Sequence, residues 1–66
     1  MIVNYYKLWE LLEFSQLNKG ELQKMITVSD PTMAKLNKNE PVSMDVMLRI
    51  CKVLHCDIGD VMEVTE

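Results

Sequence analysis

The sequence predicts an all-α fold of five short helices, with a helix-turn-helix unit over residues 19–37. Three observations support this prediction. Apolar residues recur at helical spacing in several segments, capping residues separate these segments, and glycine and proline are too scarce for a β-rich turn pattern. A chain of 66 residues has room for one domain, which we expect to span residues 1–66 with its core over about 5–63.

The first helix is expected over residues 5–14. Its inner face has the spacing i, i+3, i+4 and i+7, which is one side of an α-helix, and contains Tyr5, Leu8, Trp9 and Leu12. The two aromatic residues of this face are therefore interpreted as core residues and not as a platform for stacking bases. Asn4 is placed to cap the helix at its start.

The next two helices form the helix-turn-helix unit. Asn18 and Glu21 have the spacing of a capping box, which predicts a second helix over residues 19–26. Thr27 and Val28 then form the turn, and either Ser29 or Asp30 caps a third helix over about 30–37. The side chains expected to face the core are Leu22, Met25, Ile26, Met33 and Leu36.

Two further helices complete the predicted domain. Ser43 is the expected cap of a fourth helix over about 44–55, and Asp57 caps a short fifth helix with Asp60 at its third position. The ends of the chain, residues 2–3 and 62–64, either pair as a short β-ribbon or mediate dimerisation. The inner stripe of the fourth helix is expected to contain Met44, Met47, Leu48, Cys51 and Leu54.

Charge is distributed unevenly along this acidic chain, whose net charge is −3. Residues 15–39 carry four lysines against two acidic residues, whereas residues 40–66 carry two basic residues against six acidic ones. The basic segment coincides with the helix-turn-helix unit. This asymmetry indicates that one side of the protein faces a polyanion.

The third helix has the right surface for the major groove of DNA. Its exposed positions are expected to be small or polar, and small residues let a helix approach the groove floor. The start of the helix also offers free N–H groups and a positive dipole end to phosphates. These expected exposed positions are Asp30, Pro31, Thr32, Ala34 and Lys35.

In chain order, the segments ELQKM, VSDPTMAKL, NKNEPVSMDVMLRIC and LHCDIGDVME resemble the Cro/phage-repressor-type (XRE) helix-turn-helix family. The resemblance covers about residues 5–63 and is strongest to small stand-alone members with a compact repressor-like domain. It implies a sequence-specific transcriptional regulator that binds double-stranded DNA, often as a homodimer, with the third helix in the major groove. Two positions depart from the family pattern. Gln23 replaces a small alanine and Thr27 replaces a glycine, so we expect either a reshaped turn or a different helix crossing.

Individual residues are expected to take one of two roles at the DNA. Thr32, Lys35 and Asp30 are expected to read bases, while the DNA backbone is held by Lys19, Ser29, Asn37, Lys38 and Asn39. If Asp30 caps the third helix, its carboxylate is instead occupied by backbone amides. The complete set of expected DNA-binding residues is Lys19, Ser29, Asp30, Pro31, Thr32, Lys35, Asn37, Lys38 and Asn39.

An alternative function from another class is a protein–protein interaction module on the same fold, such as an anti-repressor, an antitoxin partner or an assembly domain. The net negative charge, Asp30 and the absence of a strongly basic helix favour this alternative. An exposed apolar patch over the third helix, in place of a basic one, would support it.

We expect no enzymatic activity, no cofactor and no small-molecule substrate, because the chain has no catalytic motif and is too short for a water-excluding pocket. A zinc site is not expected, because Cys51, His55 and Cys56 are too few ligands, and the two cysteines are interpreted as buried structural thiols. Without a long apolar run or the pattern of a signal peptide, the protein is expected to be cytoplasmic.

Overall fold

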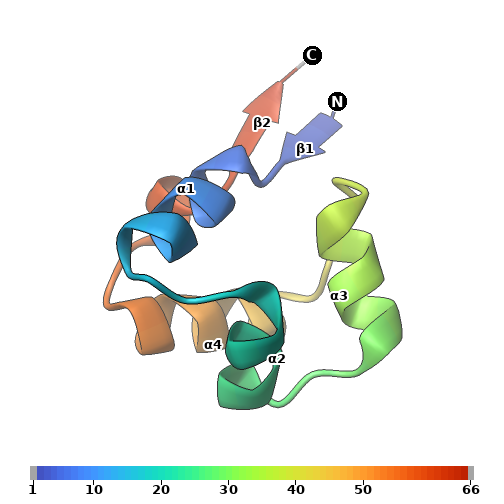
Figure 1. The fold of residues 1–66 in the computed structure, drawn as a ribbon. Helices are drawn as coiled ribbons and strands as arrows, with labels where there is room; N and C mark the ends of the chain where they lie inside the picture. The colour runs from blue at the N-terminus through green and yellow to red at the C-terminus, as the bar shows by residue number, and fades with distance from the viewer. Residues whose placement is uncertain (1, 66) are drawn as a thin grey trace.

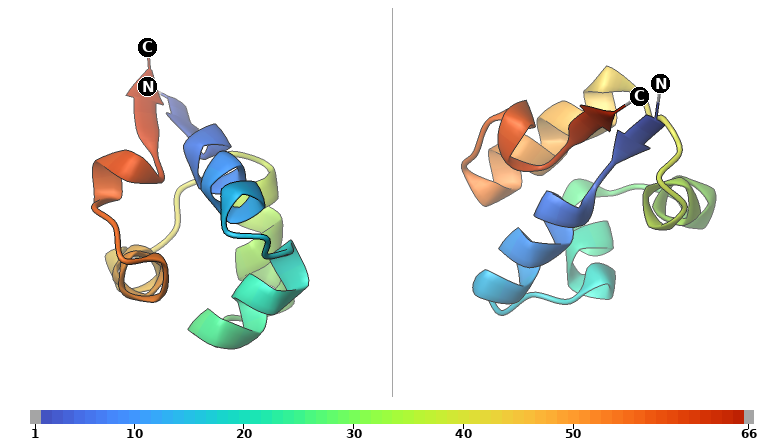
Figure 2. Two further views of the ribbon diagram at one scale, coloured as in Figure 1. Left: turned by 60° about the vertical axis from the view of Figure 1, so that its left-hand side comes forward. Right: turned by 90° about the horizontal axis from the view of Figure 1, so that it is seen from above.

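The computed structural model describes residues 2–65, which form four α-helices, one turn of 3-10 helix and a two-stranded antiparallel sheet (Figure 1). The ends of the described chain lie side by side in the sheet, and the helices form the rest of the molecule (Figure 2). The elements in chain order are β1 (Ile2–Asn4), α1 (Tyr6–Phe14), α2 (Lys19–Ile26), α3 (Asp30–Asn37), α4 (Met44–Leu54), η1 (Ile58–Asp60) and β2 (Glu63–Thr65).

The start of α1 differs by one residue from the predicted one. Tyr5, expected inside the helix, is the N-cap residue and makes no side-chain capping bond. Asn4, the expected cap, lies one residue earlier and accepts a hydrogen bond from the Tyr6 amide at 2.8 Å through its Oδ1. Tyr5, Leu8 and Leu12 are buried, as their spacing predicts. Trp9 is only half-buried and packs against the edge of the core.

The predicted capping box at the start of α2 is present. The Glu21 amide donates to Asn18 Oδ1 at 2.8 Å, and the Asn18 amide donates to Glu21 Oε1 at 3.1 Å. Leu22 and Ile26 are buried, but the prediction that Met25 faces the core is wrong, because 51% of Met25 is exposed. Neighbouring residues of a helix lie on different sides, so the burial of Ile26 turns Met25 outward.

The turn after α2 is built around a left-handed threonine. Thr27 has φ 55° and ψ 60°, a conformation that glycine adopts with less strain. Thr27 therefore adopts the conformation expected of the glycine that the resemblance places at this position. Arg49 Nη1 donates to the carbonyl oxygens of Ile26 at 3.2 Å and Thr27 at 3.1 Å, which satisfies acceptors at the open end of α2.

The loop between α3 and α4 is bonded to the start of α1. The Tyr5 amide donates to Asn39 Oδ1 at 3.2 Å, and the Tyr5 hydroxyl donates to the Glu40 carbonyl at 2.8 Å. Asn39 also has a positive φ of 57°, which asparagine tolerates better than most residues. These contacts hold the loop after α3 against the start of α1.

The inner face of α4 differs from the predicted one. Val46, Met47 and Ile50 are buried, whereas Met44 and Leu48 are 59% and 57% exposed. Apolar residues occupy two adjacent sides of this helix, and both sides have helical spacing. Packing of α2 against α4, which sequence periodicity does not report, selects the buried side.

The prediction of a fifth α-helix is wrong, because Asp57 starts only a single 3-10 turn. The predicted capping box is present, with the Asp57 amide donating to Asp60 Oδ2 at 3.0 Å. Val61 is then buried and the chain enters β2, which leaves no room for a longer helix. The chain ends pair as a ribbon of β1 and β2, which is one of the two expected alternatives, with Val3 opposite Val64.

One apolar core joins all four helices and the segment after η1. No helix within residues 2–65 is long and apolar enough to cross a membrane. The buried core residues are Tyr5, Leu8, Leu12, Leu22, Ile26, Met33, Leu36, Val46, Met47, Ile50 and Val61.

Candidate nucleic-acid interface

α3 lies at the edge of the molecule with one side in the core and the other open to solvent (Figure 1). Met33 and Leu36 are buried as predicted, and they hold the helix on the core. Asp30, Pro31 and Lys35 are exposed, whereas Thr32 and Ala34, both expected to be exposed, are half-buried. None of the large hydrophobic residues that are exposed within residues 2–65 belongs to α3.

The start of α3 settles the choice between the two expected caps. Ser29 is the N-cap residue and Asp30 is the first residue of the helix. Ser29 Oγ does not accept a backbone hydrogen bond in this position but lies 3.2 Å from Thr32 Oγ1. Backbone N–H groups in a first helical turn have no intrahelical partner, so this end of α3 presents donors to the solvent.

Gln23 connects α2 to the start of α3. Its Nε2 donates to the carbonyl oxygen of Val28 at 3.2 Å and to Asp30 Oδ1 at 2.7 Å. The expectation that backbone amides occupy the carboxylate of Asp30 if it caps the helix does not apply, since Asp30 lies inside α3. The sequence marks Gln23 only as a departure from the pattern of the resemblance, because the partners of its side chain depend on how α2 and α3 cross.

Lys19 and Asn37 are brought together from opposite ends of the helix-turn-helix unit. Lys19 Nζ donates to Asn37 Oδ1 at 2.6 Å and lies 4.2 Å from the centroid of the Trp9 ring. A cation over an aromatic face is attracted by the ring electrons. The ammonium group is thus held where α1, α2 and the end of α3 meet, and it keeps further N–H donors for a ligand.

The remaining basic residues of the unit are less constrained. Lys35 and Lys38 are exposed, and neither belongs to the one ion pair found among the described residues, which joins Arg49 to Asp45 at 2.9 Å. Asn39, expected to hold the DNA backbone, has its side-chain oxygen bonded to the Tyr5 amide. Its contribution to a DNA contact is therefore restricted to its remaining polar groups.

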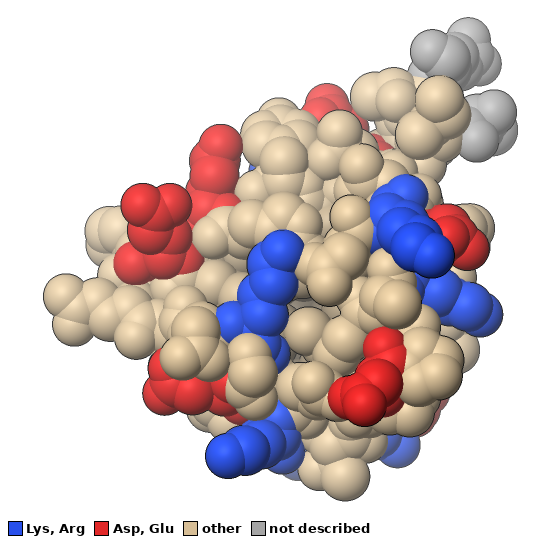
Figure 3. All heavy atoms as spheres, turned by 45° about the vertical axis from the view of Figure 1, so that its right-hand side comes forward, with Lys and Arg blue, Asp and Glu red and all other residues tan. Residues whose placement is uncertain are grey.

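The lysine and arginine side chains on one face of residues 2–65 are scattered and do not form one continuous basic patch (Figure 3). On the face drawn in Figure 3, Lys and Arg side chains are separated by uncharged atoms, and several acidic groups lie among them. Four lysines against two acidic residues in residues 15–39 give this part of the protein a modest positive excess. A surface of this kind attracts a polyanion only weakly at long range, so tight binding of one depends on defined contacts.

Comparison with known proteins identifies the fold. A profile of the Cro/C1-type HTH DNA-binding domain matches residues 7–66. The chain belongs to this family. Among solved structures, the chain is similar to the transcriptional regulator VanUg, with 50% sequence identity over 98% of this chain and 88% of that chain and a TM-score of 0.94. No curated protein matches the chain significantly.

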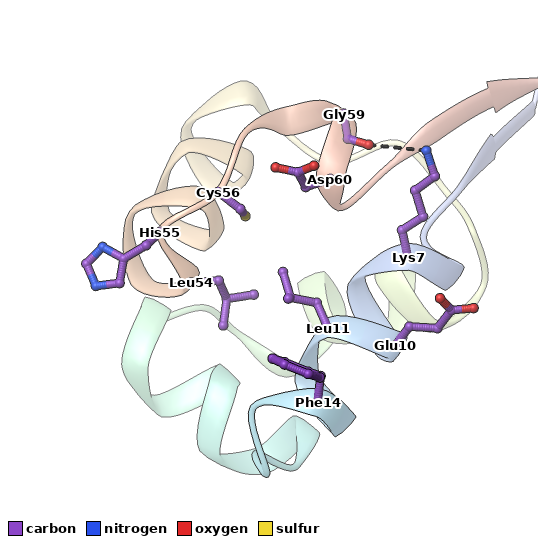
Figure 4. Close-up of a pocket in the computed structure, with 9 residues that line it drawn as sticks. All are labelled: Lys7, Glu10, Leu11, Phe14, Leu54, His55, Cys56, Gly59 and Asp60. Atoms are coloured by element: carbon purple, nitrogen blue, oxygen red, sulfur yellow. Dashed lines mark hydrogen bonds between the residues drawn. The ribbon is translucent and has the colours of Figure 1, made fainter.

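A second surface feature of this Cro/C1-type domain is a groove between α1 and the segment around η1 (Figure 4). Its volume is about 660 Å³, and Leu11 and Leu54 lie on its apolar part. Phe14 stands at its edge with 86% of its surface exposed, and Lys7 Nζ donates across it to the Gly59 carbonyl at 3.3 Å. No residue of α2 or α3 lines the groove, so it is separate from the candidate DNA-binding surface.

The cysteines lie at the end of α4, also outside the helix-turn-helix unit. Cys51 and Cys56 are free and half-buried, and the Cys56 amide donates to the Cys51 carbonyl at 3.0 Å. Burial, with the nearby Cys51 thiol, raises the pKa of Cys56 to about 11. Within residues 2–65, no three His, Cys, Asp or Glu side chains are grouped so as to hold a metal ion.

Proposed function

We propose that this DNA-binding transcription regulator recognises specific sequences by inserting α3 into the major groove. The observation that carries the proposal is the outward side of α3, which is polar, free of large apolar residues and flanked by lysines. The major groove admits an α-helix and presents a different donor and acceptor pattern for each base pair. We also propose that residues 1–66 act together as one DNA-binding domain.

The proposed contacts divide into two groups. Asp30, Thr32 and Lys35 lie on the side of α3 that enters the groove, where they read base edges, and Pro31 packs against the groove wall. Contacts to the DNA backbone fix the position of the domain without reading sequence. These backbone contacts are assigned to Lys19, Ser29, Asn37, Lys38 and Asn39, with Asn39 restricted by its bond to Tyr5.

We further propose that the protein binds DNA as a homodimer. Two recognition helices related by a two-fold axis would meet successive major grooves at a separation of about 34–36 Å. Sedimentation with and without DNA tests this proposal. A monomer that binds at full affinity would refute it.

The interaction-module alternative is less well supported. Its distinguishing feature was an exposed apolar patch over α3, and the exposed large hydrophobic residues within residues 2–65 all belong to other elements. Three observations still favour this alternative, namely the net charge of −3, the acidic Asp30 at the start of α3 and the absence of a strongly basic helix. This net charge is compatible with DNA binding, because most of the acidic excess lies in residues 40–66, which follow α3 in the chain.

Selection of bound sequences from a random duplex pool at moderate salt tests the proposed function. We expect enrichment of a short palindromic site, because a two-fold symmetric dimer recognises two equivalent half-sites. Binding to that site should weaken steeply as salt is raised, since phosphate contacts release counterions. Failure to enrich any sequence would contradict sequence-specific recognition and favour the interaction module.

A further inference from the structure

Gln23 and Asp30 form a bonded pair at the corner of the helix-turn-helix unit. Gln23 is half-buried on α2, and its side-chain nitrogen donates to the Val28 carbonyl at 3.2 Å and to Asp30 Oδ1 at 2.7 Å. Both N–H groups of the amide are therefore used. The first bond holds the amide against the turn, and the second holds the carboxylate against the amide.

The carboxylate oxygens of Asp30 can still accept hydrogen bonds from a ligand on the outer side of α3. A carboxylate has several lone-pair sites on its two oxygens, and Gln23 occupies one of them. Within the described residues, no backbone amide donates to the Asp30 side chain, and Asp30 is exposed at the first position of α3. The positive end of the helix dipole stabilises a negative charge at this position.

An outward carboxylate on a helix in the major groove can only accept hydrogen bonds. Guanine presents acceptors there, thymine presents an acceptor and a methyl group, and adenine presents an acceptor beside its amino group. Cytosine presents its N4 amino group as a donor with no acceptor of its own on that edge. Cytosine is thus the base whose edge best matches Asp30.

We propose that Gln23 and Asp30 act as a pair that selects cytosine at one position of each half-site, with Asp30 touching the base and Gln23 positioning Asp30. This inference rests on the proposed insertion of α3 into the major groove. Gln23 acts by holding the carboxylate in one orientation, so that less side-chain freedom is lost when the base is bound. This positioning role explains why α2 has a glutamine at residue 23, where a small residue is usual in the family.

The test is selection from a random duplex pool with the unaltered protein and with Asp30→Asn. We expect the unaltered protein to prefer cytosine at the position facing Asp30 by roughly tenfold. Asp30→Asn should move that preference to adenine, because an asparagine amide pairs with both N6 and N7 of adenine. The control is Glu13→Gln, which removes an exposed negative charge from α1 and should leave all base preferences unchanged.

Two variants of Gln23 test its positioning role. Gln23→Met keeps the length of the side chain but loses its donor, and it should flatten the preference at that one position while the rest of the site is still selected. Gln23→Lys, which can still donate to Asp30, should restore the preference for cytosine. Thermal unfolding followed by circular dichroism checks that each variant is folded.

The outcomes separate this inference from the proposed function. If the unaltered protein selects a site but Asp30→Asn leaves every base preference in place, the inference is wrong and the proposed function stands. If Asp30→Asn changes the preference but Gln23→Met does not, the positioning role of Gln23 is overturned. If the unaltered protein selects no site, both the proposed function and the inference fail.

Discussion

Lys19 Nζ donates a hydrogen bond of 2.6 Å to Asn37 Oδ1, which joins the first residue of α2 to the last residue of α3. The Trp9 ring lies beneath the same ammonium group, so the cation is held by two partners from different helices. A positive charge fixed at the junction of both helices of the unit is well placed to bind a phosphate that flanks the major groove.

Lys19→Ala should weaken DNA binding by about tenfold, because one phosphate contact is lost. The fall of log affinity with log salt should also become less steep, by about 1 in the slope. Fluorescence anisotropy over a series of salt concentrations measures both quantities. Lys52→Ala on α4 is the matched control, since it removes an exposed lysine outside the unit. Equal losses for the two variants would show that only net charge matters.

Lys35 should contribute to sequence-specific binding, whereas Lys38 should contribute equally to binding of any duplex. Lys35→Ala is expected to weaken binding mainly to the preferred site, by about 1–3 kcal/mol, because a base contact is lost. Lys38→Ala should weaken binding to preferred and unrelated duplexes equally and flatten the salt dependence. Competition assays with both duplexes measure this difference. Unaltered binding by both variants would place the recognition surface elsewhere.

Thr27→Gly should stabilise the protein by about 1 kcal/mol. Thr27 has φ 55°, and the strain of a β-branched residue in this region exceeds the entropic cost of a glycine there. Lys24→Gly in the last turn of α2, where the backbone is helical, is the comparison, and it should destabilise the protein by about 1 kcal/mol. Urea denaturation of both variants gives the free energies of unfolding. A loss of stability in Thr27→Gly would show that the threonine side chain contributes more than its strain.

The stability of the protein should decrease as pH rises from about 9 to about 11, in part through Cys56. Burial raises the pKa of this thiol from its ordinary value of 9.0 to about 11, so the folded protein keeps a proton that the unfolded chain has lost. The unfolded state then binds fewer protons, and the free energy of unfolding falls with pH. Urea denaturation across this range should show a shallower fall in Cys56→Ala. Parallel curves for the two proteins would contradict the raised pKa.

The start of α2 and the inner side of α3 follow from the sequence because local patterns determine them. The capping box of Asn18 and Glu21 starts α2, and the apolar spacing of Met33 and Leu36 defines the inner side of α3. Asp57 and Asp60 show the limit of this reasoning. Their capping box forms as predicted, but the length of the element after it depends on Val61 reaching the core and on the pairing of β1 with β2.

The side-chain contacts within the candidate site could not be predicted from the sequence, because they depend on tertiary structure. The Lys19–Asn37 and Gln23–Asp30 bonds join side chains whose distance depends on the angle between α2 and α3. The buried side of α4 is likewise selected by packing, because Met44 and Leu48 satisfy helical spacing as well as Val46 and Ile50 do. Sequence patterns identify which residues share a helix face, and tertiary structure decides what that face meets.

The central claim is that the outer side of α3 and the start of α2 form the DNA-binding surface. Titration of the isotope-labelled protein with its selected duplex, followed by amide chemical shifts in NMR spectra, tests this claim most directly. We expect the largest changes at residues 18–20 and 29–38. Changes concentrated around Leu11, Phe14 and Leu54, with α3 unaffected, would contradict it and assign binding to the groove between α1 and η1.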